Sequence, residues 1–178
     1  MVKETHTKGS YIFSLLALPF VFNKYLSNYE LGYRVILIFI YAYFSYVGSL
    51  FPDIDMKNSY ISKIFPKIYR SLGSKFRHRG ITHSLIFVYL LCNLFNAIVK
   101  CSENNIVFIC SFSGFIVGYV SHLCLDLLTK EGIELFYPIS INFSILPIKT
   151  SSKSEKIFCK VLNFIFIFLL GYRFYILL

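Results

Sequence analysis

Long apolar blocks alternate with short polar stretches along the whole chain. The blocks cover residues 11–22, 33–51, 81–99, 106–128 and 157–178. A helix needs roughly 20 apolar residues to cross a bilayer, and the first block reaches that length if its helix begins near Thr5. The pattern predicts an all-α, polytopic membrane helix bundle with about five transmembrane helices, formed as a single domain by residues 1–178.

The composition supports this class. The chain is 56% hydrophobic and only 15% charged, with a mean hydropathy of +0.64. A soluble domain carries about 25% charged residues, so the composition argues against one. The five cysteines include no C-x-x-C pair. We interpret them as small buried hydrophobes rather than as a disulfide framework or a zinc ribbon.

The net charge of +9 has two interpretations. One is nucleic-acid binding, and the other is that lysine and arginine mark cytoplasmic loops. We favour the second, because the charges follow the ends of the apolar blocks, and we expect no nucleic-acid partner. The loops 56–80 and 129–156 are the basic ones. The chain is therefore expected to be a multi-pass protein of the plasma or inner membrane, with a cytoplasmic N-terminus and an external C-terminus.

The first basic loop also has an apolar pattern. Its cations are Lys57, Lys63, Lys67, Arg70, Lys75, Arg77 and Arg79. Apolar residues recur between them at helical spacing, which predicts a short amphipathic helix on the bilayer surface. The expected stripe is Ile61, Ile64, Phe65, Ile68 and Leu72.

Two helix faces carry polar or small residues at i, i+4 spacing. One face of the first helix holds His6, Ser10 and Ser14. One face of the fourth helix holds Gly114, Gly118, His122 and Asp126. Small residues in membrane helices usually face other helices, so both faces should point into the bundle.

Histidine and aspartate are scarce, and each of them lies at or near the end of an apolar block. These residues are His6, His78, His83, His122, Asp53, Asp55 and Asp126. The predicted topology brings all seven to the cytoplasmic side of the membrane. Imidazole and carboxylate without thiolate suit zinc, manganese or iron, and we favour zinc. Seven candidate ligands exceed the needs of one ion, so one or two ions are expected, and two-metal sites favour phosphoester hydrolysis.

Several motifs together resemble a known family. They are Thr5-His6, Leu50-Phe51-Pro52-Asp53-Ile54-Asp55, His78-Arg79-Gly80-Ile81-Thr82-His83-Ser84, Gly118-Tyr119-Val120-Ser121-His122, Asp126-Leu127-Leu128-Thr129, Gly132, Leu135-Phe136-Tyr137-Pro138, Leu146-Pro147, Thr150 and Glu155. This set resembles the YdjM-type membrane-bound metal-dependent hydrolases (the DUF457 family) over nearly the whole chain. One departure is Thr150-Ser151-Ser152, where relatives often have T-G-S.

The resemblance implies an inner-membrane location and metal-dependent hydrolysis. The spacing of His122 and Asp126 is also similar to part of the zinc site of bacterial zinc-dependent phospholipase C and related zinc nucleases. We therefore expect a cytoplasm-facing site that hydrolyses a phosphoester, such as a phospholipid headgroup, with membrane lipids as partners. The expected metal ligands are His6, Asp53, Asp55, His83, His122 and Asp126.

Three residues are expected to act directly in the reaction. Asp53 is counted here as well as among the ligands. His78 is either a further ligand or the general acid for the leaving group. The forked guanidinium of Arg79 suits the oxygens of a phosphate.

Two other functions are compatible with parts of the pattern. A transporter would place ionisable residues near the bilayer midplane, often in inverted repeats, whereas here they lie at helix ends and no repeat is visible. A non-catalytic membrane regulator could use the same ligands only to hold its helices together. A measured turnover on a phosphoester separates that regulator from an enzyme.

Overall fold

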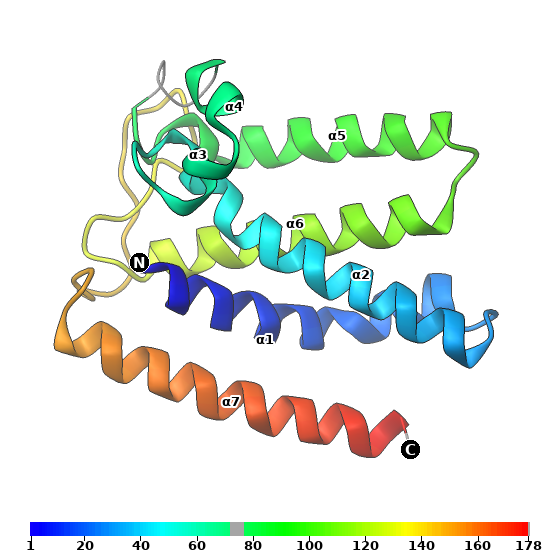
Figure 1. Cartoon of the computed structure of the whole chain (residues 1–178). Helices are drawn as coiled ribbons and strands as arrows, with labels where there is room; N and C mark the ends of the chain where they lie inside the picture. The colour runs from blue at the N-terminus through cyan, green and yellow to red at the C-terminus, as the bar shows by residue number, and fades with distance from the viewer. Residues whose placement is uncertain (72–76, 178) are drawn as a thin grey trace.

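A computed structural model describes residues 1–71 and 77–177 of the chain. Five long helices run alternately from one end of the molecule to the other (Figure 1). They are α1 (Lys3–Val21), α2 (Leu31–Leu50), α5 (Leu85–Cys101), α6 (Ile106–Leu127) and α7 (Lys153–Leu177). These helices match the five apolar blocks, and the described residues form an all-α bundle with isolated β-bridges only.

Short helical turns join the long helices. A π-helical turn, η1 (Phe22–Leu26), follows α1, and a 3-10 turn, η2 (Phe51–Asp55), follows α2. Another 3-10 turn, η4 (Ile81–His83), precedes α5. The helices α3 (Tyr60–Ile64) and α4 (Pro66–Ser71) lie in the first basic loop.

Among the residues that the structure describes, three helical stretches are long and apolar enough to cross a membrane. They are Leu31–Asp55, Ile106–Leu127 and Lys153–Ile176. The helix α5 is apolar but shorter, with 17 residues, and α1 carries Lys3, Glu4 and Lys8 in its first two turns. The chain is thus a membrane protein by its helices, and the number of five spans stays a prediction.

The tightest helix contact joins α2 and α6. A Cβ atom on Gly114 would collide with the carbonyl oxygen of Tyr41, and one on Gly118 with that of Ser45. In the opposite direction, a Cβ atom on Gly48 would collide with the backbone of Phe115. Glycine lets the two backbones touch at these points, which confirms the predicted contact face of the fourth apolar block.

A polar seam runs between α1 and α2. The hydroxyl of Ser14 donates to Ser45 Oγ at 2.6 Å, and the hydroxyl of Tyr41 donates to the carbonyl of Ser14 at 3.2 Å. Ser10 is fully buried beside them. The predicted inward orientation of Ser10 and Ser14 is therefore confirmed. Their hydroxyl groups form hydrogen bonds inside the bundle that lipid tails could not supply.

The first basic loop differs from the expected single amphipathic helix. The chain forms α3 and α4 instead, separated at Phe65, whose φ of −117° and ψ of 63° are not helical. The cause is Pro66, since a proline ring disfavours helical backbone in the residue before it. Ile61 is buried, whereas Ile64 is 50% exposed. The predicted Leu72 and Lys75 lie outside the described residues.

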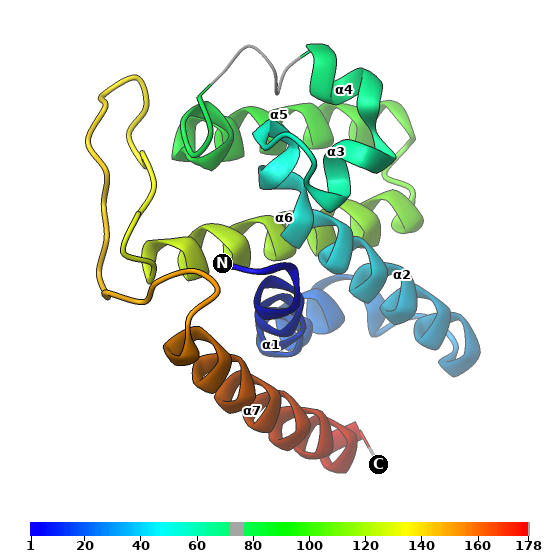
Figure 2. The same cartoon turned by 60° about the vertical axis from the view of Figure 1, so that its left-hand side comes forward.

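The segment between α6 and α7 forms a long loop that lies beside the start of α5 (Figure 2). Ile133 and Phe143 form an antiparallel bridge, which makes a narrow loop. The amide of Leu85 donates to the carbonyl of Leu135 at 2.9 Å, and the amide of Glu134 donates to the carbonyl of Arg79 at 3.2 Å. The loop thereby fixes the segment that carries His78 and His83.

The last helix, α7, lies at the edge of the bundle and packs mainly along α1 (Figures 1 and 2). Only 6% of its most apolar 18-residue stretch is buried. One polar contact holds its far end, where Arg173 Nε donates to the carbonyl of Leu15 at 3.0 Å. Most of α7 therefore offers its apolar side chains to the membrane.

Candidate metal centre

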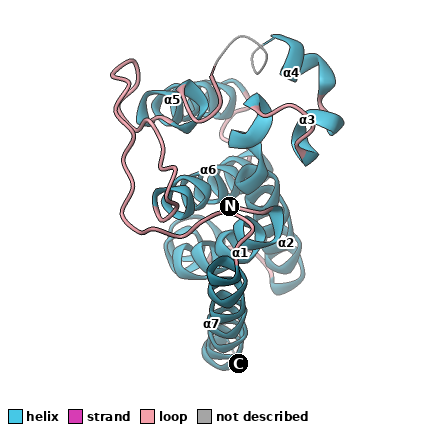
Figure 3. Cartoon of the chain, turned by 90° about the vertical axis from the view of Figure 1, so that its left-hand side faces the viewer, coloured by secondary structure: helices cyan, strands magenta, loops and turns pink. Residues whose placement is uncertain are grey.

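All four histidines and all three aspartates gather at one end of the bundle. His6 comes from the first turn of α1, and His122 and Asp126 come from the last turns of α6. The turns η2 and η4, together with residues 77–80, supply Asp53, Asp55, His78 and His83. Figure 3 looks onto this end, where the loops and the N-terminus meet. The structure brings together every residue that the sequence suggested as a ligand.

Four atoms form the inner part of this group. Nε2 of His122 lies 3.7 Å from Asp53 Oδ1 and 3.7 Å from Asp126 Oδ2. Nε2 of His83 lies 3.9 Å and 3.8 Å from the same two oxygens. Zinc bonds of about 2.0–2.2 Å at tetrahedral angles place neighbouring ligand atoms roughly 3.4 Å apart. Each of these four nitrogen–oxygen distances is thus within about half an ångström of that spacing, and ligand atoms of His83, His122 and Asp126 all lie within 4.8 Å of one another.

The histidine nitrogens at the centre have no hydrogen-bond partner among the described residues. This holds for Nε2 of His83, for Nε2 of His122 and for both nitrogens of His6. All three rings are fully buried. Leaving a buried polar atom unpaired costs about 1–3 kcal/mol, and a cation bound by these nitrogens would remove that cost. A divalent metal bound by these nitrogens and the adjacent carboxylates fits the residues present.

The other nitrogen of two rings is anchored. Nδ1 of His122 lies 2.6 Å from the carbonyl oxygen of Ser49, so it carries the hydrogen. Nδ1 of His83 lies 3.4 Å from Asp55 Oδ2 and 3.0 Å from the hydroxyl of Thr82. Such contacts fix the tautomer of a metal-binding histidine and direct its free nitrogen toward the ion. In both rings the free nitrogen is the Nε2 that faces the aspartates.

Asp55 is the most heavily hydrogen-bonded of the aspartates. Its Oδ1 lies 2.8 Å from Nδ1 of His78. Its Oδ2 accepts hydrogen bonds from the amide of Arg79 at 3.1 Å and from the hydroxyl of Thr82 at 2.6 Å. These contacts suit a carboxylate that orients His78 and His83. Asp53, Asp55 and His78 also have ligand atoms within 4.8 Å of one another, close enough to share a second ion.

Arg79 lies against the carboxylates of the site. Its Nη2 is 3.2 Å from Asp126 Oδ2, and its Nη1 is 3.2 Å from Glu131 Oε2. The backbone of Arg79 has a φ of 65°, and the hydrogen bond from its own amide to Asp55 Oδ2 supports this conformation. Glu131 is the more exposed of the two carboxylates, at 53%, so it is the one that a phosphate could replace at this guanidinium.

Some contributors could not be found by searching for ligand-type side chains. The Ser49 carbonyl is a backbone atom, and nothing in the sequence marks it as the partner of His122. Thr82 lies inside the histidine motif but is not itself a ligand type. Glu131 has no histidine near it in the sequence, and only the fold brings it to Arg79.

Glu155 has a structural task beside the centre. Its carboxylate accepts hydrogen bonds from the amide of Val2 at 2.7 Å, the hydroxyl of Thr5 at 3.1 Å and the amide of Ser151 at 2.6 Å. It therefore ties the turn before α7 to the start of α1, which carries His6. Ser151 has a φ of 62°. This is the left-handed conformation that glycine favours, so the turn is kept even with serine at this position.

Comparison with known proteins supports the grouping of these motifs. A family model described as "YdjM inner membrane protein" matches residues 1–178. The uncharacterized protein YvsG of Bacillus subtilis is 36% identical over 112 residues, which are 62% of this chain and 66% of that protein. The inner membrane protein YdjM of Escherichia coli is 34% identical over 108 residues, or 61% of this chain and 54% of that protein. The matches thus cover less than two thirds of either relative. No solved structure matches the chain.

Proposed function

The chain belongs to the family of YdjM inner membrane proteins, and from this premise we propose that it is a membrane-bound, metal-dependent hydrolase of phosphoesters. The observation that carries the proposal is the convergence of two free imidazole nitrogens and two carboxylate oxygens, from His83, His122, Asp53 and Asp126. The family description names a location and no reaction. The reaction class therefore rests on the chemistry of this group.

The inner ligands would be His83, His122, Asp53 and Asp126, with His6 completing the set. Their nitrogen and oxygen atoms favour zinc, with manganese or iron as the other metals that suit them. A second ion would use the outer group that contains Asp55 and His78, and His78 would then be a ligand and not the general acid. When bound, such ions supply Lewis-acid polarisation of a phosphoryl oxygen and activation of water at neutral pH.

His78 is suited to protonate the leaving group. Its Nδ1 is held by Asp55 at 2.8 Å, which leaves Nε2 free, and its side chain is 39% exposed. The carboxylate of Asp55 stabilises the protonated imidazole and keeps its orientation. A histidine in such a pair works as a general acid when it can reach the leaving oxygen.

Arg79 is suited to bind the phosphate. A guanidinium binds two phosphate oxygens with two parallel N–H groups. In this role Nη1 would exchange the exposed Glu131 for the substrate, while Nη2 stays near Asp126. The substrate would then lie between Arg79 and the metal ligands.

The location of the centre favours a substrate from the membrane surface. The ligands belong to the ends of α1, α2 and α6 and to η4, at the depth of lipid headgroups if these helices cross the bilayer. The predicted topology makes this the cytoplasmic side. Exposed Lys63, Lys67 and Arg77 surround the same end, and such cations attract anionic lipids. A phospholipid headgroup is therefore the substrate that we favour.

The test is turnover by purified, metal-loaded protein in detergent and in liposomes. We expect release of phosphate or of a phosphorylated headgroup from one member of a panel of phospholipids, nucleotides and aryl phosphates. A chelator should abolish the reaction, and Asp53→Asn should lower the rate by orders of magnitude.

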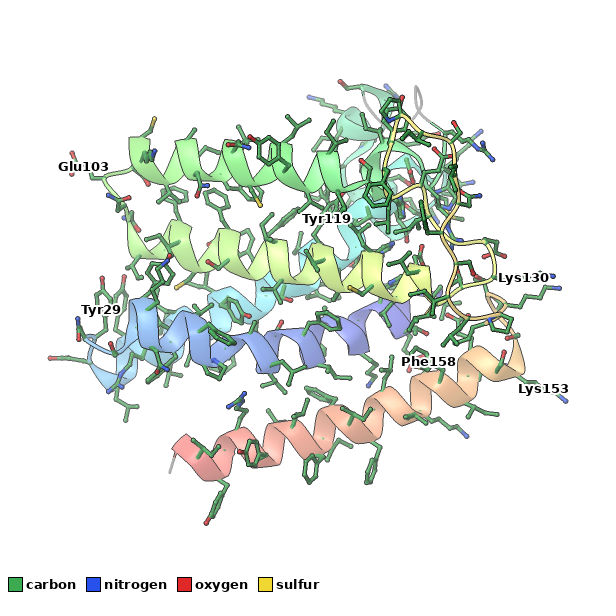
Figure 4. The ribbon with its side chains drawn as sticks, turned by 180° about the vertical axis from the view of Figure 1, so that it is seen from behind. Tyr29, Glu103, Tyr119, Lys130, Lys153 and Phe158 are labelled. Atoms are coloured by element: carbon green, nitrogen blue, oxygen red, sulfur yellow. The ribbon has the colours of Figure 1, made fainter. Side chains whose placement is uncertain are left out.

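The control is Glu103→Gln. Glu103 lies at the opposite end of the bundle from Lys130 and Lys153, which are at the same end as the metal centre (Figure 4). A rate that survives Asp53→Asn would point to a contaminating phosphatase. A protein that holds its metal but turns over no member of the panel would be a non-catalytic metal-binding regulator.

A further inference from the structure

A second polar feature lies near the metal centre, in a cleft between α1 and α7. The cleft has a volume of about 750 Å³, which is within the usual range for small-molecule sites. Lys8 of α1 lines one wall, and Lys156, Cys159, Lys160 and Asn163 of α7 line the other. The motifs of the metal centre use none of these five side chains.

The lysines of the cleft form a cationic group without matching anions. Lys156 and Lys160 are one turn apart on the same side of α7, where like charges repel. Neither forms an ion pair within residues 1–71 and 77–177. Lys8 extends across from α1, and its Nζ donates to Asn163 Oδ1 at 2.6 Å. Three lysine side chains from two helices therefore line one space.

Neither of the two carboxylates in the lining forms an ion pair with these lysines in the part of the chain that the structure describes. Glu155 is 1% exposed, and three hydrogen bonds from Val2, Thr5 and Ser151 occupy its oxygens. Glu4 is exposed to solvent on the other wall. The cleft consequently has room and charge for a phosphate group.

The surroundings of the cleft are those of a lipid. Beyond Asn163, α7 continues with exposed Phe164, Ile167 and Phe168. The cleft thus lies where α7 changes from polar to apolar, which is the depth of the headgroups for a helix that crosses the bilayer. Basic pockets between membrane helices on the cytoplasmic side bind the headgroups of anionic lipids. A free anion would use only the polar part of this surface.

We propose that the cleft between α1 and α7 binds an anionic phospholipid, with Lys8, Lys156 and Lys160 around its phosphate and its acyl chains along the apolar side of α7. The bound lipid would fill the space beside a helix that packs mainly on α1. It would also bridge α7 to the segment that carries His6. This lipid is a structural ligand, and the proposal does not depend on hydrolysis at the metal centre.

Cys159 offers a direct probe, because it lines the cleft and is partly exposed. The full chain is placed in nanodiscs of phosphatidylcholine, with and without phosphatidylglycerol. Alkylation by N-ethylmaleimide is then followed at each cysteine by mass spectrometry. We expect phosphatidylglycerol to slow alkylation of Cys159 several-fold and to leave the exposed Cys101 unchanged.

A matched pair of variants identifies the cause. The double substitution Lys156→Gln with Lys160→Gln should remove the protection of Cys159. Lys149→Gln with Lys153→Gln removes the same charge from exposed positions outside the cleft and should keep the protection.

Three results would overturn the proposal. One is equal alkylation of Cys159 in the two kinds of nanodisc, which an experiment on the wild-type chain alone can reveal. Another is an equal degree of protection of Cys159 in the two double variants, which would mean that Lys156 and Lys160 have no special part in the protection. The third is protection by inorganic phosphate in phosphatidylcholine nanodiscs, which would assign the cleft to a free anion.

Discussion

The imidazole rings of His6 and His122 are stacked, with their centroids 3.7 Å apart and their planes 7° from parallel. The two residues come from α1 and α6 and lie more than a hundred positions apart in the sequence. Nε2 of His6 lies 3.4 Å from Asp126 Oδ1, while Nε2 of His122 lies 3.7 Å from the other oxygen of the same carboxylate. Two parallel rings thus face one aspartate, whose Oδ1 also pairs with the N-terminal ammonium of Met1 at 2.7 Å.

The first prediction separates stacking from metal binding at His6. His6→Phe keeps an aromatic ring against His122 but removes both nitrogens. If His6 is a ligand, metal affinity should fall by about tenfold or more, while the unfolding temperature of the metal-free protein should change little. Titration with zinc, together with thermal unfolding in a chelator, measures both. Unchanged affinity would restrict His6 to packing.

The second prediction concerns the contact between α2 and α6. Gly118→Ala places a methyl group against the carbonyl oxygen of Ser45, and overpacking of this kind costs about 1–3 kcal/mol. Since α2 leads directly to Asp53 and α6 carries Asp126, metal affinity should fall as well.

Gly171→Ala is the control, because a Cβ atom there meets nothing within 4 Å among the residues that the structure describes. The unfolding temperature of Gly118→Ala should be clearly lower than that of Gly171→Ala. Equal temperatures would mean that the two helices separate freely and that the close contact contributes little.

Much of the architecture could be predicted because membrane helices are apolar in blocks. The block 106–128 corresponds to α6 (Ile106–Leu127) almost residue for residue. The i, i+4 spacing of Gly114 and Gly118 also identified the face that packs on α2. The prediction of a single helix in the first basic loop was wrong, although the sequence contains the signal for the break between α3 and α4. Pro66 follows Phe65 and interrupts the apolar stripe.

The candidate site was partly predictable for a different reason. Histidine and aspartate are rare in this chain, so their positions at the ends of successive apolar blocks indicated one shared location. The hydrogen bonds around them were not predictable, because they depend on loop conformation. Asp55 was expected only as a ligand, yet its bonds to His78 and Thr82 suit an orienting role. The pairing of Arg79 with Asp126 likewise needed the fold.

The third prediction tests orientation in the membrane. The lysine and arginine distribution predicts that the turn after α5 is external, and Cys101 is exposed there. With the other four cysteines replaced, Cys101 should react with a membrane-impermeant maleimide in intact cells. A chain whose only cysteine is introduced as Lys130→Cys, on the loop beside the metal centre, should react only after lysis. The reverse pattern would place the metal centre outside.

The most direct test of the account is the metal content of the purified chain and of two variants at the centre. Elemental analysis after reconstitution with zinc and removal of free ions should find at least one ion per wild-type chain. His122→Ala and Asp126→Ala should each lose most of it, because each removes an atom from the inner group of four. Glu103→Ala, at the opposite end of the bundle, should retain the wild-type amount. Equal metal content in all four proteins would contradict a metal centre at this place.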